Sequence, residues 1–326
     1  MGMYKRVFIA IIICVMSGCT KKSLVDKLSE ENFFESINKN KVRVIAPASG
    51  APPSQFNNLH EVLKGKIEFD TNIMDGSSVF HSKKDKLRME DFIESINSKD
   101  NVLWAFRGGY GSGKLIDHLY KVKKPNAKKI IIGYSDITAL HIFLSQEWDW
   151  ESVHGAMVTE INDDTKNINN FRSLDAILKG GASIICLNKL NRFKQEDEIL
   201  TKIVGGNIAI IQNSIGTKWQ IKTGGKILFL EDLGDKGYKI DRVLNHFRDA
   251  GLFDEVKAVI FGNFYKPKDE YIRYAIELFL EKANFPVYET QLIGHGKDNL
   301  PIVINSQATI SRKCGNKYVL STQLTR

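Results

Sequence analysis

Short apolar runs alternate with amphipathic segments from about residue 41 onward, and this alternation constrains the fold most strongly. The expected strands of the first half are 41–49, 66–73, 101–106 and 128–135. The expected helices there are 88–98 and 113–122. The pattern predicts an α/β protein with a parallel sheet covered by helices. Ligands of such sheets bind beyond the carboxyl ends of the strands.

The chain divides into two units in this interpretation. Residues 158–200 are less regular, and a second unit with its own strands and helices begins near Thr201. The predicted organisation is a signal peptide at 1–18, a tether at 19–40, an N-terminal domain at 41–165, a linker at 166–200 and a C-terminal domain at 201–326.

The first 19 residues differ from the rest. A cationic pair at 5–6 precedes an apolar run at 7–16, and small residues follow at 17–18 before Cys19. This order is typical of a secretory signal. Ten apolar residues are too few to cross a hydrocarbon core of about 30 Å as a helix.

Ser-Gly-Cys at the end of this segment resembles the lipobox of bacterial lipoproteins, with Met16 in place of the usual leucine. The resemblance implies that Cys19 is acylated and that a lipid anchor holds the protein in the cell envelope. The residue after this cysteine is Thr20, not the aspartate that retains such lipoproteins in the inner membrane. We therefore expect a lipoprotein that faces the periplasm, on the outer membrane.

Composition limits the partners. The chain has 326 residues, of which 43% are hydrophobic and 26% charged, as in globular proteins. Its net charge of +8 falls to +6 when Lys5 and Arg6 leave with the signal, and we find no nucleic-acid motif. No Cys/His cluster suggests a metal, so no cofactor is expected. Whether Cys186 and Cys314 pair stays open.

The stretch KKIIIGYSDITAL at 128–140 places Ser135 at the break between an apolar run and a helix. A serine there is most often a helix cap. The alternative is a nucleophile on a sharp turn, but Ile137 stands where the pattern G-x-S-x-G needs its second glycine. The stretch alone leaves both interpretations open.

The glycine-rich stretch FRGGYGSGKL at 106–115 also has two interpretations. Gly108 to Lys114 has the spacing of a phosphate-binding loop, which would make the chain a nucleotide-binding protein. Leu115 occupies the position of the magnesium-binding hydroxyl, which argues against this. Otherwise the backbone N–H groups of the loop face a substrate or a developing oxyanion.

Six separated stretches together carry a family resemblance. They are FRGGYGSGKLIDHL, GYSDITALH, VHGAM, GGNIAII with SIGT, ILFLEDLGDKGYKIDRVL with AGLF, and IGHGKDN. In this order they resemble the serine LD-carboxypeptidases, a family that includes the microcin C immunity peptidases. The resemblance covers about residues 42–312. It implies a flavodoxin-like N-terminal domain and a smaller, swivelling-type α/β C-terminal domain, with the active site in the cleft between them.

The resemblance assigns a Ser-Glu-His triad to Ser135, Glu231 and His295. It implies an oxyanion hole formed by the backbone N–H groups of Asp136 and Gly109. Taken alone, His295 could line a loop, Glu231 could be a solvated acid, and Asp232 competes for the carboxylate role. A serine hydroxyl needs a base to take its proton, and a carboxylate behind the imidazole fixes the tautomer of that base.

The implied reaction removes the terminal D-alanine from peptidoglycan tetrapeptide stems or muropeptides. Arg107, Gly108 and Tyr110 are expected to bind the substrate, although Arg107 could equally form a structural salt bridge. Ala156 replaces the proline that the family commonly has in VHGAM, which could alter substrate fit. The other expected partners are a membrane, through the lipid anchor, and, as an open alternative, a second copy of the chain in a homodimer.

Overall fold

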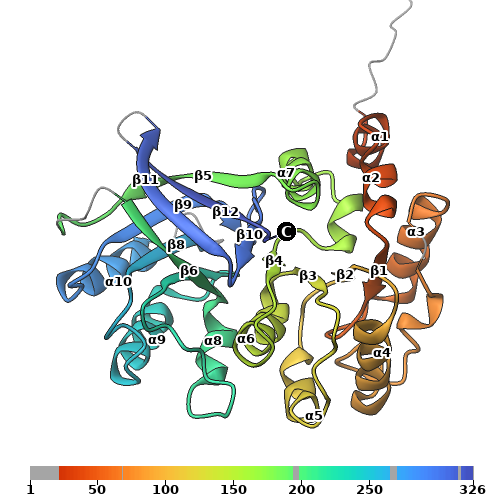
Figure 1. Ribbon diagram of the computed structural model, residues 1–326, viewed down its shortest axis with the longest axis horizontal. Helices are drawn as coiled ribbons and strands as arrows, with labels where there is room; N and C mark the ends of the chain where they lie inside the picture. The colour runs from red at the N-terminus through yellow and green to blue at the C-terminus, as the bar shows by residue number, and fades with distance from the viewer. Residues whose placement is uncertain (1–21, 68, 194–197, 265–269, 315–316, 326) are drawn as a thin grey trace, which may run out of the picture.

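The computed structural model describes residues 22–67, 69–193, 198–264, 270–314 and 317–325. Figure 1 shows two units side by side: an open sheet with helices on both faces, and a barrel with helices along one side. The predicted signal peptide, Cys19 and the first residues of the predicted tether lie outside the described residues. No helix in the described part combines the length and apolarity needed to cross a bilayer.

The open sheet has the strand order β1-β2-β3-β4-β10, in which the first four strands are parallel and β10 runs antiparallel to β4. Its strands are β1 (Val42–Ile45), β2 (Val102–Ala105), β3 (Ile130–Gly133), β4 (Ser152–His154) and β10 (Ile302–Ile304). The predicted parallel sheet of the N-terminal half is therefore confirmed.

Helices cover both faces of this sheet because successive residues of a strand point to opposite sides. Val44 and Trp104 pack on one face, whereas Ile45 and Leu103 pack on the other. The first face is covered by α1 (Leu24–Glu30), α2 (Phe33–Lys39), α3 (Pro53–Leu63) and α7 (Ile168–Leu178). The second is covered by α4 (Asp85–Asn97), α5 (Ile116–Leu119) and α6 (Thr138–Glu147).

The seven-stranded barrel has the order β11-β12-β5-β9-β8-β7-β6. Its strands are β5 (Ala182–Lys189), β6 (Glu198–Asn207), β7 (Ile227–Asp232), β8 (Ala258–Phe264), β9 (Val287–Gly294), β11 (Gln307–Cys314) and β12 (Lys317–Gln323). Its helices are α8 (Ile208–Ser214), α9 (Gly237–Asp249) and α10 (Glu270–Glu281). Along β7, Leu228 and Leu230 pack in the cluster that includes residues of these helices, whereas Phe229 belongs to a second cluster with residues of the other barrel strands.

Residues 24–39 were expected within a polar tether, and the structure corrects this. They form α1 and α2, whose apolar side chains are buried against the sheet. The buried positions recur as i, i+1 and i+4 in both helices, namely Leu24, Val25 and Leu28, then Phe33, Phe34 and Ile37. This spacing makes one apolar stripe on a helix, although the surrounding residues are polar.

Two further expectations differ from the structure. The described residues of 66–73 form no strand, since the Asp70 side chain accepts a hydrogen bond from Asn72 N and starts the 3-10 helix η1 (Thr71–Ile73). The predicted linker at 166–200 contains α7, which belongs to the core of the sheet unit, and β5, which belongs to the barrel.

Strand β10 crosses from the C-terminal half of the chain into the sheet of the N-terminal half. Its side chains alternate between the two cores: Ile302 and Ile304 pack in the barrel cluster and Val303 in the sheet cluster. The two units therefore share a strand, and the C-terminal unit is a barrel joined to the sheet by buried packing.

Candidate active site

A cavity of about 840 Å³ lies between the two units at the carboxyl ends of the parallel strands. The sheet unit supplies most of its lining, including Arg107, Gly108, Gly109 and Ser135. The barrel contributes His295. Side chains far apart in the sequence therefore meet in the cleft where the family resemblance predicted the active site.

Ser135 lies on the turn between β3 and α6, as the first residue of the 3-10 helix η3 (Ser135–Ile137). Its φ of 61° is in the left-handed region that residues other than glycine rarely adopt. Neither η3 nor α6 has a side-chain cap hydrogen bond, so the interpretation of Ser135 as a helix cap is wrong. Its half-exposed side chain faces the cavity.

The sharp turn requires glycine at position 133, because the neighbouring side chains pack too closely to admit a Cβ there. A Cβ at Gly133 would lie 2.9 Å from the side chains of Ala105 and Ile137, which leaves no room for one. On the other side of the turn, the buried carboxylate of Asp136 accepts a hydrogen bond from Ser112 N at 2.7 Å. The turn is therefore held by its own strand, its own helix and the neighbouring glycine-rich loop.

Glu231 and His295 form the central pair of the site. Glu231 is fully buried at the end of β7, and its Oε2 lies 2.6 Å from Nδ1 of His295, which follows β9. The side chain of His295 is only 9% exposed and lines the cavity. Asp232, the competing acid, instead accepts the backbone N–H groups of Gly234 and Asp235.

The environment of His295 sets its protonation. Burial disfavours the imidazolium and lowers the pKa of His295, but the nearby carboxylates, Glu231 first and then Asp232 and Glu160, together raise that pKa above its ordinary value. Other buried histidines behave differently. Burial lowers the pKa of His141 to about 4 and holds the pKa of His154 well below its usual range. Only His295, of these three, combines a carboxylate partner with access to the cavity.

Ser135 and His295 are near one another without being bonded. Within the described residues no hydrogen bond joins the two side chains, and the ring of Tyr134, the residue before the serine, lies 4.8 Å from the His295 ring. Hydrogen bonds of a catalytic base often tighten only when substrate binds. The geometry thus places a bonded carboxylate–imidazole pair and the serine at the same cavity.

The glycine-rich loop lies against the turn of Ser135. A Cβ at Gly108 would lie 3.0 Å from Cβ and 3.2 Å from Oγ of Ser135, and one at Gly109 would overlap the side chain of Ser49. Gly109 also has a φ of 105°, so it needs the conformational freedom of glycine. Both glycines line the cavity, which lets backbone atoms approach the serine closely.

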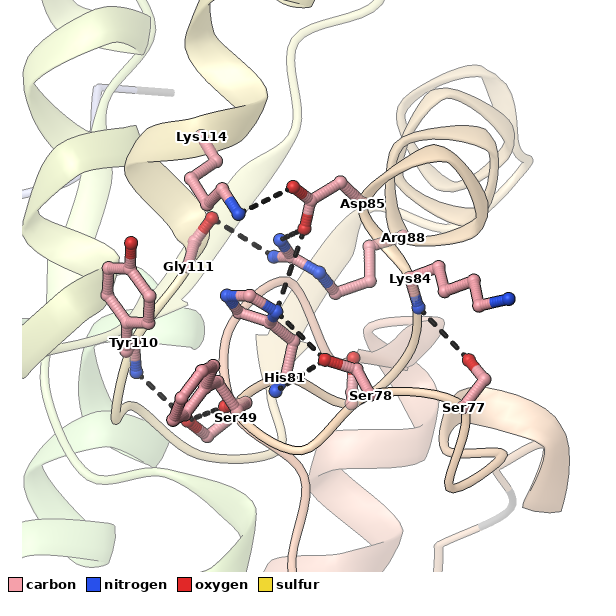
Figure 2. Close-up of polar contacts among 12 residues, drawn as sticks. Ser49, Ser77, Ser78, His81, Lys84, Asp85, Arg88, Tyr110, Gly111 and Lys114 are labelled. Atoms are coloured by element: carbon pink, nitrogen blue, oxygen red, sulfur yellow. Dashed lines mark hydrogen bonds and ion pairs between the residues drawn. The ribbon is translucent and has the colours of Figure 1, made fainter.

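Figure 2 shows how the far side of this loop is anchored. The buried Arg88 guanidinium donates to Gly111 O at 3.0 Å and to Asp85 Oδ1 at 2.6 Å. Lys114 Nζ lies 2.7 Å from the other oxygen of Asp85. Lys114, which the phosphate-loop interpretation would aim at a nucleotide, is thus held by a carboxylate from α4.

Of the three expected substrate-binding residues, Arg107 and Gly108 line the cavity and Tyr110 does not. Arg107 lines the cavity and donates to Gly50 O at 3.0 Å, and none of the described ion pairs involves it. The ring of Tyr110 lies 5.1 Å from that of His81, and its backbone N–H donates to Ser49 Oγ (Figure 2). Tyr110 is not part of the cavity lining.

The sequence interpretation missed a buried polar network beside the cavity. Tyr134 Oη donates to Glu160 Oε1 at 3.0 Å, and Lys166 Nζ lies 2.7 Å from the same oxygen. No motif in the sequence points to Glu160 or Lys166, because both lie in the irregular stretch that begins at residue 158. Among the described residues no group of His, Cys, Asp and Glu could hold a metal ion.

The chain is similar to known proteins over most of its length. The profile described as LD-carboxypeptidase N-terminal domain matches residues 42–155, and the profile described as LD-carboxypeptidase C-terminal domain matches residues 201–310. A Rickettsia conorii protein with the provisional name carboxypeptidase is 38% identical over 87% of this chain and 92% of its own. The murein tetrapeptide carboxypeptidase of Pseudomonas aeruginosa is 25% identical over 65% of this chain and 73% of its own.

The fold also matches solved structures. The muramoyltetrapeptide carboxypeptidase of Oxalobacter formigenes superposes with a TM-score of 0.74 at 21% identity, covering 87% of this chain and 98% of that one. The two-unit architecture is therefore the one seen in that structure. Together with the matches of both domains and the Rickettsia relative, it shows that the chain belongs to the LD-carboxypeptidase family of serine peptidases.

Proposed function

We propose that this chain hydrolyses the amide bond between an L-configured centre, usually of meso-diaminopimelate, and the terminal D-alanine of a peptidoglycan tetrapeptide stem. The observation that carries the proposal is the Glu231–His295 pair, 2.6 Å apart, at the cavity that Ser135 also lines. Family membership supports the type of bond, and the Pseudomonas aeruginosa relative supports the stem peptide as substrate.

In the proposed reaction, neutral His295 accepts the hydroxyl proton of Ser135 as Oγ bonds to the carbonyl carbon. Electron density moves to the carbonyl oxygen, which the N–H groups of Gly109 and Asp136 stabilise. The C–N bond then breaks, and His295 returns the proton to the amine of D-alanine. A water molecule then bonds to the acyl carbon and loses a proton to His295; the C–Oγ bond breaks, His295 returns that proton to Ser135 Oγ, and the tripeptide leaves with a new carboxyl group.

Arg107 is our candidate for the terminal carboxylate of the substrate. It lines the cavity beside Gly108, and its bond to Gly50 O occupies one of the five N–H donors of the guanidinium. A guanidinium can hold a carboxylate through two parallel hydrogen bonds. The position of Arg107, next to the glycine-rich loop and the serine, supports this role.

The proposed location is the periplasmic face of the outer membrane, through acylation of Cys19. Helix α1 starts at Leu24, whose N–H donates to Asp164, a residue of the cavity lining. Five residues of chain span at most about 18 Å. An acyl group on Cys19 would therefore keep the cavity close to the bilayer, where it would remodel nearby wall or fragments. Fractionation of Cys19→Ala tests this: a wild type found with the cytoplasmic fraction would contradict it.

Release of D-alanine from disaccharide-tetrapeptide tests the proposed reaction. We expect wild type to remove one alanine by mass spectrometry, with EDTA present or absent. A substrate with an amidated terminal carboxyl should react much more slowly, because Arg107 then meets no anion. Equal rates for the free and amidated substrates would contradict the carboxylate contact. Hydrolysis of an acyl-sulfamoyl nucleoside in place of the muropeptide would instead indicate a microcin-immunity-like peptidase.

A further inference from the structure

The loop that carries His295 rests on residues 166–170, a segment that the sequence pattern assigned to a linker. In Figure 1, α7, which begins in this segment, lies between α2 of the sheet unit and the end of β5 of the barrel. Lys166 Nζ donates to Gly296 O (3.0 Å) and His295 O (3.4 Å). Asn167 donates through its backbone N–H to Lys297 O (3.0 Å) and through Nδ2 to Asp298 Oδ1 (2.6 Å). Asn170 donates through Nδ2 to Lys297 O (3.1 Å), and its Oδ1 accepts Asn299 N (2.9 Å).

Lys166 extends this support to the nucleophile turn. Its Nζ lies 2.7 Å from Glu160 Oε1, which also accepts the hydroxyl of Tyr134, the residue before Ser135. The second oxygen of Glu160 accepts Met157 N at 2.8 Å. One buried ion pair therefore connects the turn of the serine to the backbone of the histidine loop.

Both residues border the cavity, but their side chains are mostly buried and bonded within the protein. The side chains of Lys166 and Glu160 are only 11% and 8% exposed. An ammonium group has three N–H donors, and Lys166 has three acceptors in Glu160, His295 O and Gly296 O. With its donors used within the protein, Lys166 is poorly suited to capture a substrate carboxylate.

Stability alone does not account for this pair. The desolvation cost of a buried ion pair often cancels its attraction, so neutral replacements of similar size can be tolerated without loss of stability. What the pair does provide is a fixed geometry between two loops from different units. A misplacement of about 1 Å can slow an enzyme by about 100-fold.

We propose that Glu160 and Lys166 are positioning residues that hold the His295 loop in register with the Ser135 turn. The proposal rests on the triad of the proposed function. Neither residue takes part in bond breaking. The pair acts through Tyr134 on the serine side and through two backbone carbonyls on the histidine side.

The test is the double variant Glu160→Gln/Lys166→Met, which removes both charges and leaves no lone buried ion. We expect a melting temperature near that of wild type, a kcat for disaccharide-tetrapeptide at least about 10-fold lower, and a KM within about twofold. The matched control is Glu35→Gln/Lys39→Met, which removes an exposed pair on α2 with side chains 63% and 72% exposed. The control should leave kcat unchanged.

Hydrogen–deuterium exchange provides a readout that needs no substrate. The backbone amides of 294–299 should exchange faster in the Glu160→Gln/Lys166→Met variant, while those of β7 should not change. An unchanged kcat, unchanged exchange at 294–299, or a higher KM with normal kcat would each overturn the proposal, the last by making Lys166 a substrate contact. If wild type leaves the muropeptide intact, the proposed substrate is wrong, and the exchange result alone decides the positioning role.

Discussion

The turn of Ser135 and the loop of His295 are held in place by different kinds of contact. The serine turn depends on neighbours within the sheet unit: Gly133 packs under it, and Asp136 accepts Ser112 N, 24 residues away. The histidine loop depends on Glu231, 64 residues away, and on Lys166, 129 residues away. The first arrangement lies within one unit, whereas the second exists only after the two units have packed together.

This difference between the two segments predicts which property of the protein each substitution will change. Changes of the Ser135 side chain should abolish chemistry with little effect on the rest of the fold, because that side chain is half-exposed at the cavity. Changes around the histidine should alter the protonation or placement of the base. Changes in helices that do not reach the cavity should alter stability alone.

The largest effect should follow Ser135→Ala. Without the nucleophile no acyl-enzyme forms, and kcat should fall by a factor of about 10⁴ or more, while circular dichroism and melting temperature stay near those of wild type. The control is Ser145→Ala on α6, whose hydroxyl donates to Ile142 O away from the cavity. A Ser135→Ala protein with a tenth of wild-type activity would contradict the assignment of the nucleophile.

The second prediction concerns pH and Glu231→Gln. In wild type, kcat/KM should rise as pH increases through the raised pKa of His295, because only neutral imidazole accepts the serine proton. Removing the Glu231 charge lowers the pKa of His295, so the acidic limb should move to lower pH. The plateau should drop by about 10²- to 10⁴-fold because the imidazole loses its orienting carboxylate.

Asp232→Asn is the control for the pH profile. Asp232 is also near His295, but its carboxylate is engaged by the turn that follows β7, so its removal should move the acidic limb less. A larger displacement of the limb in Asp232→Asn than in Glu231→Gln would show that the wrong acid has been assigned.

Two glycines of one loop provide the third prediction. A methyl group at Gly108 would press on Cβ and Oγ of Ser135, so Gly108→Ala should lower kcat by about 10- to 100-fold. Gly113→Ala is the matched control, since the nearest atoms to its new methyl group lie 3.8 Å away. Steady-state kinetics of the two variants would compare them directly. Similar activities would mean that Gly108 does not constrain the serine.

The smallest effect on kcat should follow Leu28→Ala in α1. Leu28 is fully buried, and loss of its side chain should lower the free energy of unfolding by about 2–5 kcal/mol. Denaturant titration measures the loss, and kcat of the folded variant should match wild type. The control Glu30→Ala removes only an exposed ion pair with Lys22. An unchanged stability of Leu28→Ala would return residues 24–39 to the role of a tether.

The sequence by itself determined the features that depend on local pattern. Alternating apolar runs predicted the parallel sheet, and the family resemblance carried by six motifs in order assigned Ser135, Glu231 and His295. Of these, Ser135 and His295 line one cavity and Glu231 contacts His295. The catalytic roles of these residues stay predictions until the variants are measured. Strand periodicity can be recognised locally because neighbouring residues alone create it. The role of Ser135 needed the family resemblance, because its stretch alone also fits a helix cap.

Only the tertiary structure decided which polar residues are buried together. Glu160 and Lys166 lie in a stretch that resembles a solvated loop, and their burial depends on Tyr134 and on the histidine loop of the other unit. In the same way, β10 alternates between two cores that no local pattern reveals. Charge and hydropathy along the chain report what a residue prefers, but burial depends on which distant surface packs against it.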